Sequence, residues 1–212
     1  MMFFKITFHL DGSGLFYDPN EPIHLDALLA WVLAPRQGFR EIHSRDEVPG
    51  HVRLPLEWKK ISGNMVWCAS ALFPEGAQGE DLRFWRKRFR QGKADISDGS
   101  PNLTNGAYRD WNMPIPITLT PRMAAYANGG RKECKKLLQE VRHLGKKRAH
   151  GYGKIISMDF DEIPEDWSMV KDGKAMRFLP DENGWREVRV TPPYWNNCNR
   201  VKCCEIGDEY TL

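Results

Sequence analysis

Residues 144–156 read LGKKRAHGYGKII, a stretch in which three glycines and four lysine or arginine residues lie between two different patterns. Before it, Leu137, Leu138, Val141 and Leu144 fall on one stripe of a predicted helix over residues 132–144, with Gly145 as its C-cap. After it, residues 155–160 (IISMDF) have the composition of a strand. The sequence therefore predicts a basic, glycine-rich loop that connects a helix to a strand.

This loop does not match the P-loop of nucleotide-binding proteins. A P-loop ending at Gly153 and Lys154 would need a glycine in place of Arg148 and a serine or threonine in place of Ile155. It would also connect a strand to a helix, which is the reverse of the order here. Flexible glycines flanked by cations suit several phosphates of a polynucleotide, while the alternative is a solvated turn whose lysines are favoured by the helix dipole. The predicted binding residues are Gly145, Lys146, Lys147, Arg148, His150, Gly151, Tyr152, Gly153 and Lys154.

A second basic segment, residues 83–93 (RFWRKRFRQGK), holds six lysine or arginine residues and no acid. Phe84, Trp85 and Phe89 interleave with these cations. Cations pair with phosphates and flat rings stack on bases, a combination typical of proteins that bind single-stranded nucleic acid. The alternative is an amphipathic helix or hairpin that buries the rings. The binding residues predicted here are Arg83, Trp85, Arg86, Lys87, Arg88, Phe89, Arg90 and Lys93.

The rest of the chain supplies further predicted elements. Residues 3–10 alternate as a half-buried strand, residues 25–32 have helical spacing that Pro35 ends, residues 65–73 form a buried strand, and residues 115–119 form an edge strand. The order predicts an α+β fold: a ferredoxin-like (RRM/RAMP-type) antiparallel sheet with helices on one face. We expect this domain to span residues 1–160, with a basic insertion at about 80–112, and residues 161–212 to be its β-rich extension, with strands at 175–179 and 185–190.

Composition excludes several classes of protein. The 212 residues carry a net charge of +3, and 41% of them are hydrophobic, enough for a packed core. No long apolar run or signal peptide is present, so we expect a cytoplasmic protein without a membrane partner. The five cysteines are irregularly spaced and predict reduced thiols, with no metal or cofactor. A zinc site at Cys198, Cys203 and Cys204 is the disfavoured alternative, because no paired ligand cluster occurs elsewhere, and the sequence assigns these three no role.

The loop of residues 144–153, with an apolar residue and glycines between a helix and a strand, resembles the glycine-rich loop of the RAMP superfamily of CRISPR proteins. Residues 23–34 (IHLDALLAWVLA) resemble the opening helix of the Cas-five-like subunit, the third Csf protein, of type IV CRISPR effector complexes. This resemblance covers residues 3–35 and 114–160. It implies a ribonucleoprotein subunit of antiviral defence that caps the 5′ handle of CRISPR RNA and docks on the backbone and large subunits.

Two other functions remain open from the sequence. Some RAMP relatives cleave precursor RNA without a metal, and histidine suits that acid–base chemistry near neutral pH. His24, His143 and His150 are therefore candidates, with His24 and His150 the main alternative catalytic residues; the expectation is binding without catalysis. A general single-strand binder would keep the basic segments but lack partner surfaces.

Overall fold

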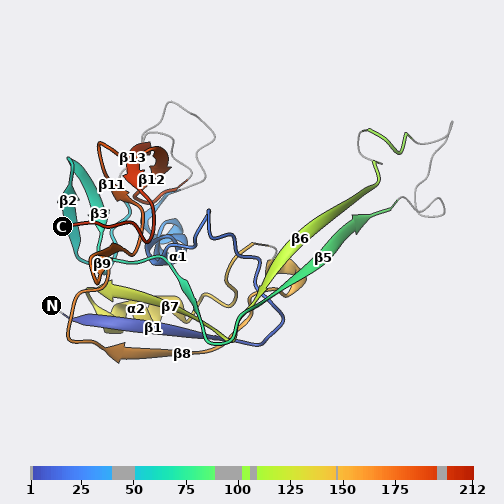
Figure 1. The fold of residues 1–212 in the computed structure, drawn as a ribbon. Helices are drawn as coiled ribbons and strands as arrows, with labels where there is room; N and C mark the ends of the chain where they lie inside the picture. The colour runs from blue at the N-terminus through green and yellow to red at the C-terminus, as the bar shows by residue number, and fades with distance from the viewer. Residues whose placement is uncertain (1, 40–50, 89–101, 106–108, 147, 195–199) are drawn as a thin grey trace.

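The computed structural model describes residues 2–39, 51–88, 102–105, 109–146, 148–194 and 200–212 (Figure 1). Its main sheet has four strands in the order β4-β7-β1-β8, and every neighbouring pair is antiparallel. The strands are β1 (Phe3–Leu10), β4 (Phe73–Glu75), β7 (Arg122–Asn128) and β8 (Ile155–Glu162). Helix α1 (Leu25–Leu33) follows β1, and helix α2 (Arg131–Leu138) follows β7. The predicted α+β class is confirmed.

One face of the sheet carries the main hydrophobic core. Phe4, Ile6 and Phe8 of β1 have no exposed side-chain area, as their alternation in the sequence predicts. They pack in one cluster with Leu29 of α1 and Leu138 of α2, so both helices lie on this face. The predictions of the first strand, the first helix and the last strand of the sheet are confirmed.

Helix α2 is shorter than the sequence predicts. It ends at Leu138, so the expected continuation to Leu144 with Gly145 as C-cap is wrong. Leu144 is still buried, but its N–H donates to the carbonyl of Gly153 at 2.8 Å, and Ile155 donates to Arg142 at 2.9 Å. Hydrogen bonds to the start of β8 replace those of a last helical turn, and the apolar spacing is kept without the helix.

The continuous strand expected at residues 65–73 is also wrong. Strand β3 (Asn64–Trp67) pairs with β2 (Trp58–Ile61), which the sequence did not indicate, and β4 begins only at Phe73. Between these two strands the backbone is irregular because two of its carbonyls accept hydrogen bonds from a buried side chain. The Arg177 guanidinium donates to the carbonyls of Trp67 and Ala69 at 2.7 and 2.8 Å.

A two-stranded arm projects from the rest of the molecule (Figure 1). Strand β5 (Gly79–Lys87) pairs along its whole length with β6 (Trp111–Leu119). The basic segment therefore begins as a strand, and the edge strand expected at residues 115–119 is the second half of β6. Much of the basic insertion expected at about 80–112 beyond Arg88 lies outside the described residues, and Trp111 and Asn112 belong to β6.

The C-terminal region forms short strands around a second core. These are β9 (Val170–Lys171), β10 (Lys174–Ala175), β11 (Leu179–Pro180), β12 (Arg186–Arg189) and β13 (Arg200–Cys204). The strand expected at residues 175–179 is divided between β10 and β11, while β12 matches the prediction at 185–190. Val66 and Cys68 share this core with Leu179 and Cys203, so the region packs directly on the chain that precedes β4.

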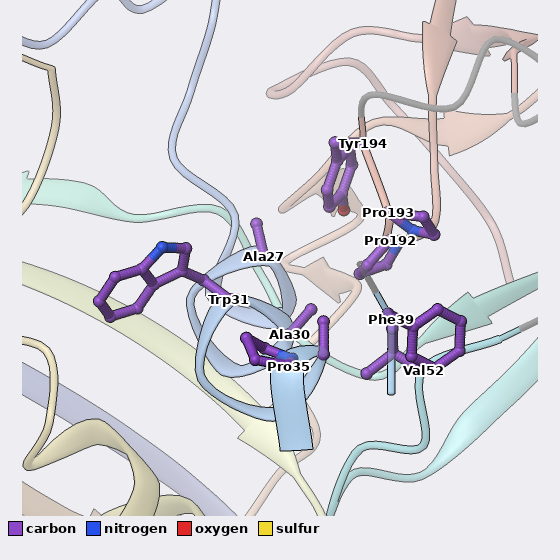
Figure 2. A pocket seen from close by; sticks show the side chains of 10 residues that line it. Ala27, Ala30, Trp31, Pro35, Phe39, Val52, Pro192, Pro193 and Tyr194 are labelled. Atoms are coloured by element: carbon purple, nitrogen blue, oxygen red, sulfur yellow. The ribbon is translucent and has the colours of Figure 1, made fainter. Parts of the chain in front are cut away.

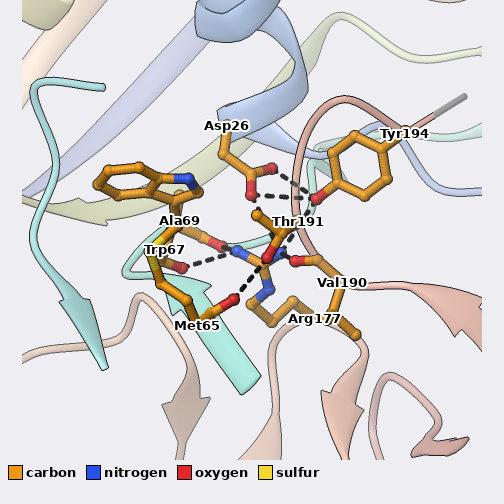
Figure 3. A network of polar contacts seen from close by, with 8 residues as sticks. All are labelled: Asp26, Met65, Trp67, Ala69, Arg177, Val190, Thr191 and Tyr194. Carbon is orange, nitrogen blue, oxygen red and sulfur yellow. Dashed lines mark hydrogen bonds and ion pairs between the residues drawn. The ribbon is translucent and has the colours of Figure 1, made fainter. Parts of the chain in front are cut away.

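A buried polar network ties this region to α1 (Figure 3). Asp26 and Arg177 are both fully buried and form an ion pair with Oδ2 and Nη2 3.1 Å apart. The Tyr194 hydroxyl donates to the Asp26 carboxylate at 2.9 Å, and Arg177 also donates to the carbonyl of Val190 at 2.7 Å. Burial raises the pKa of Tyr194 well above its ordinary value, and the negative charge of Asp26 adds to this. The ordered donors and acceptors fix the path of residues 177–194 across the helix.

Candidate nucleic-acid interface

The basic, glycine-rich loop of residues 145–154, here called the glycine loop, packs on the segment that follows β1. The N–H of Gly153 donates to the carbonyl of Gly14 at 2.8 Å, and the N–H of Lys146 donates to the carbonyl of Phe16 at 3.4 Å. The Ser13 hydroxyl donates to the carbonyl of Gly151 at 3.1 Å. The loop therefore has a defined conformation, which includes a single 3-10 turn, η4 (Arg148–His150).

Its three glycines have different roles. All have positive φ, but a Cβ on Gly145 would lie 2.5 Å from the carbonyl oxygen of Phe16, and one on Gly153 would lie 2.2 Å from that of Leu144. A Cβ on Gly151 would meet nothing within 4 Å. Gly145 and Gly153 thus allow close packing inside the protein, and Gly151 is the glycine that leaves open space for a ligand.

The structure brings the two basic segments together. The Trp85 indole of β5 lies edge-on to the His150 imidazole, with ring centroids 5.7 Å apart, and also edge-on to Trp111 of β6 at 4.1 Å. The Arg83 guanidinium lies 5.5 Å from the centre of the Tyr152 ring. The hydrogen bond that Arg83 donates to Asp81, followed by its hydrogen bond with Tyr152, raises the pKa of the exposed Arg83 guanidinium. Segments about 65 residues apart in sequence form one surface of cations and aromatic rings.

The cations on this surface are held to different degrees. Lys146 forms an ion pair with Glu21 at 2.5 Å, and both side chains are exposed. Arg148 lies over the ring of Trp31 at 5.1 Å. Together with Phe16 these side chains line a groove of about 270 Å³ between α1 and the glycine loop. Sequence reasoning missed Trp31, which is 54% exposed on α1. The signal available in the sequence was that Trp31 lies off the apolar stripe of Leu25, Leu29 and Val32.

The arm carries the remaining cations of this surface. Arg86 donates to the side chain of Asn112 at 2.9 Å. Lys87 and Arg88 are exposed beside Trp85 and Trp111 and line an open hollow with them. Lys154 is exposed at the end of the glycine loop. The predicted binding residues Phe89, Arg90, Lys93 and Lys147 lie outside the described residues.

The candidate catalytic histidines lie in different environments. His24 is 7% exposed, its ring is stacked on Tyr194 at 5.4 Å, and its Nδ1 has no hydrogen-bond partner among the described residues. Burial, followed by the charge of Arg177, lowers its pKa well below 6.5. His143 is half-buried, and its backbone forms an isolated antiparallel β-bridge with Lys154. His150 is exposed on the glycine loop. Two of the three border the basic surface: His150 lies on the glycine loop beside the arm, and His143 lines the groove between α1 and this loop.

A separate hollow of about 380 Å³ lies beside α1 (Figure 2). Its walls come from α1 and from the Pro192–Tyr194 segment, and no lysine or arginine of the described residues lines it. The lining residues are Ala27, Ala30, Trp31, Ala34, Pro35, Phe39, Val52, Pro192, Pro193 and Tyr194. Without cations it offers phosphates no partner, so it is a weaker nucleic-acid site than the surface formed by the glycine loop and the arm.

No group of three or more His, Cys, Asp or Glu side chains that could hold a metal ion occurs among the described residues. The four cysteines within them, Cys68, Cys134, Cys203 and Cys204, are buried and free, and burial raises the pKa of Cys203 to about 12. No helix in the described part of the chain is long and apolar enough to cross a membrane.

Comparison with known proteins gives one match that covers most of the chain. The family model for CRISPR type IV associated protein Csf3 matches residues 3–206. No curated protein matches the sequence. The matched range includes the main sheet, the arm, the glycine loop and all of the C-terminal strands.

Proposed function

This chain belongs to the family of CRISPR type IV associated protein Csf3, and we propose that it is the RNA-binding subunit of a type IV effector ribonucleoprotein. In this role it caps the 5′ handle of the CRISPR RNA in the cytoplasm and docks on the backbone and large subunits. The RNA lies on the surface formed by the glycine loop and the base of the arm.

The observation that carries this proposal is the meeting of Arg83 and Trp85 with Tyr152 and His150. Cations and aromatic rings from two segments form one continuous surface, which offers both phosphate partners and stacking platforms. Two charged turns that lay apart from each other would not combine phosphate partners with stacking platforms on one surface. The open space at Gly151 lets an RNA backbone approach the loop closely.

The arrangement of the main sheet supports the finer fold assignment that belongs to this proposal. A strand, a helix, two strands, a second helix and a last strand follow one another, with the first strand central beside the last and third strands. This is the order of the ferredoxin-like fold of RAMP proteins. The arm is then an insertion between the second and third strands, and the glycine loop connects the second helix to the last strand.

RNA binding by the purified chain tests the proposal. The CRISPR repeat RNA of the same locus is titrated against the unmodified chain and the double variant Arg83→Ala/Arg148→Ala. The matched control is Lys132→Ala/Lys136→Ala, which removes two exposed cations of α2. We expect the double variant to bind the RNA markedly more weakly than the unmodified chain, and the control variant to bind it as tightly as the unmodified chain. Equal losses in the double variant and the control would show diffuse electrostatic attraction and would count against a built interface.

The alternative function is a metal-independent endoribonuclease of the RAMP superfamily. The burial of His24 weighs against it, because a general base must reach the 2′-hydroxyl that it activates. His150 is exposed beside the arm and is the remaining candidate. Incubation of the purified chain with repeat RNA in EDTA decides between the two: we expect intact RNA, whereas cleavage that His150→Ala abolishes would establish the nuclease.

A further inference from the structure

Strand β8 forms one edge of the main sheet, and its outer side is open. In the described part of the chain it pairs with β1 on one side and with no strand on the other (Figure 1). Ile156 is 67% exposed on this strand, although it is a large apolar residue. A row of free backbone donors and acceptors at a sheet edge is a template on which another extended chain can add.

The two faces of this edge differ in chemistry. On the helix face, Met158 and Phe160 border a groove of about 230 Å³ between β8 and α2, with Val141 at its floor and Lys135 and Arg142 at its side. On the opposite face, Asp159 and Asp161 stand two residues apart and are exposed. A strand added here would place alternate side chains in the apolar groove and beside the two carboxylates.

These carboxylates are available to a partner. The Asp159 side chain is 61% exposed, although its Oδ2 lies 2.7 Å from Nε2 of His9. The Asp161 side chain has no hydrogen bond or ion pair with any described residue; Lys5, its neighbour across the strands, is paired with Glu75 at 2.8 Å. Lysine or arginine two residues apart on an incoming strand would lie directly opposite the two acids.

We propose that the outer edge of β8 is a docking site for an extended segment of another protein, in which apolar residues alternate with lysine or arginine. Charge excludes two other occupants. RNA phosphates would be repelled by Asp159, Asp161 and Glu162. A second copy of this chain paired antiparallel through β8 and centred on Phe160 would set Asp159 of each copy against Asp161 of the other. The groove begins at Ile155, directly after the glycine loop, but none of its lining residues belongs to the proposed RNA surface, so it adds a protein contact to the proposed function and does not depend on RNA binding.

A defined probe tests the site. A fluorescent eight-residue peptide of alternating valine and lysine is titrated against the full chain. We expect saturable binding, which Asp161→Lys weakens by about 10-fold because an attraction becomes a repulsion. Asp161→Asn is expected to give an intermediate loss, which protects the test against misfolding of the first variant. Glu187→Lys on β12 is the matched charge reversal on another strand and should bind normally.

Two control peptides separate strand addition from simple charge attraction. A peptide of alternating valine and glutamate should not bind, and N-methylation of alternate amides in the valine–lysine peptide should abolish binding, because it removes backbone hydrogen bonds and keeps the charge. Binding that survives N-methylation, or that Glu187→Lys weakens as much as Asp161→Lys, would overturn the proposal. So would the absence of saturable binding. RNA affinity of the same variants, expected to be unchanged, shows separately whether the RNA surface is intact.

Discussion

The Trp85 indole of the arm lies edge-on to the His150 imidazole of the glycine loop, with ring centroids 5.7 Å apart. This contact joins an arm that otherwise projects from the molecule to a loop fixed by backbone hydrogen bonds to Gly14 and Phe16. It thereby places the cations of both segments on one surface. The order that RNA imposes on the arm costs conformational entropy, which the contacts of RNA with both segments must offset.

Replacement of Trp85 by alanine should weaken RNA binding more than removal of any single cation of the arm. Stacking of one base on an aromatic side chain is worth about 1–3 kcal/mol, or roughly 5- to 150-fold in affinity. Phe84→Ala is the control, because Phe84 is 48% exposed on the other face of the arm. Fluorescence anisotropy with repeat RNA measures both variants. Equal losses would show that the arm binds RNA with both faces.

Removal of the Arg148 side chain should change the salt dependence of RNA binding. Each phosphate contact with a single strand contributes about 0.7 to the slope of log affinity against log salt, so Arg148→Ala should reduce the slope by about that amount. Lys146→Ala should have a smaller effect, because Lys146 is already paired with Glu21. Titrations at several salt concentrations measure the slope. An unchanged slope for Arg148→Ala would return the glycine loop to the interpretation of a solvated turn.

The sequence predicted the core of the fold because its strongest periodic patterns lie there. In strand β1, apolar and polar residues alternate with a period of two. In helix α1, apolar residues recur every three to four residues. Strand β7 was missed because RMAAYAN has little β propensity: its alanines form a strand only because it is buried beside β1. The irregular backbone before β4 depends on Arg177, more than 100 residues away, which no local pattern contains.

The residues of the candidate site were predicted better than their arrangement. Charge and aromatic composition identified residues 83–88 and 145–154, because phosphate binding requires those side chains. The contact between Trp85 and His150 depends on the angle at which the arm leaves the sheet. The position of Trp31 under Arg148 depends on the packing of α1 beside the loop. The burial of His24 follows from Tyr194, which lies 170 residues further along the chain.

Removal of one partner of the buried ion pair should destabilise the protein strongly. Asp26→Asn leaves the Arg177 charge buried without its counterion, a change that typically costs about 3–5 kcal/mol. The control is Glu140→Gln, which breaks the exposed pair with Arg36 and should cost less than about 1 kcal/mol. Urea denaturation followed by circular dichroism gives both free energies of unfolding. Similar values for the two variants would contradict a structural role for the buried network.

Acidification should destabilise the protein through His24. Its pKa is lowered well below 6.5 in the folded protein by burial and by Arg177, whereas the unfolded chain binds a proton near 6.5. Below that pH the unfolded state holds more protons, so this residue lowers the free energy of unfolding by up to about 1.4 kcal/mol per pH unit. His24→Phe keeps a ring on Tyr194 and should remove this contribution. The difference in unfolding free energy between the two proteins, measured from pH 7.5 to 5, should therefore change with pH; a constant difference would show that His24 titrates normally.

The outer half of the arm should become ordered when RNA binds. Near its base, Ile115 and Ile117 are buried, but Leu82, Phe84 and Met113 are about half exposed. Isolated two-stranded ribbons are marginally stable in water, and the cations of residues 83–88 repel one another until phosphates neutralise them. Hydrogen exchange of residues 83–87 should therefore be fast in the free protein and slow in the complex, while residues 3–10 of β1 exchange slowly in both. Slow exchange of residues 83–87 without RNA would instead show an arm that is already rigid, so that its rings and charges meet RNA as a preformed surface.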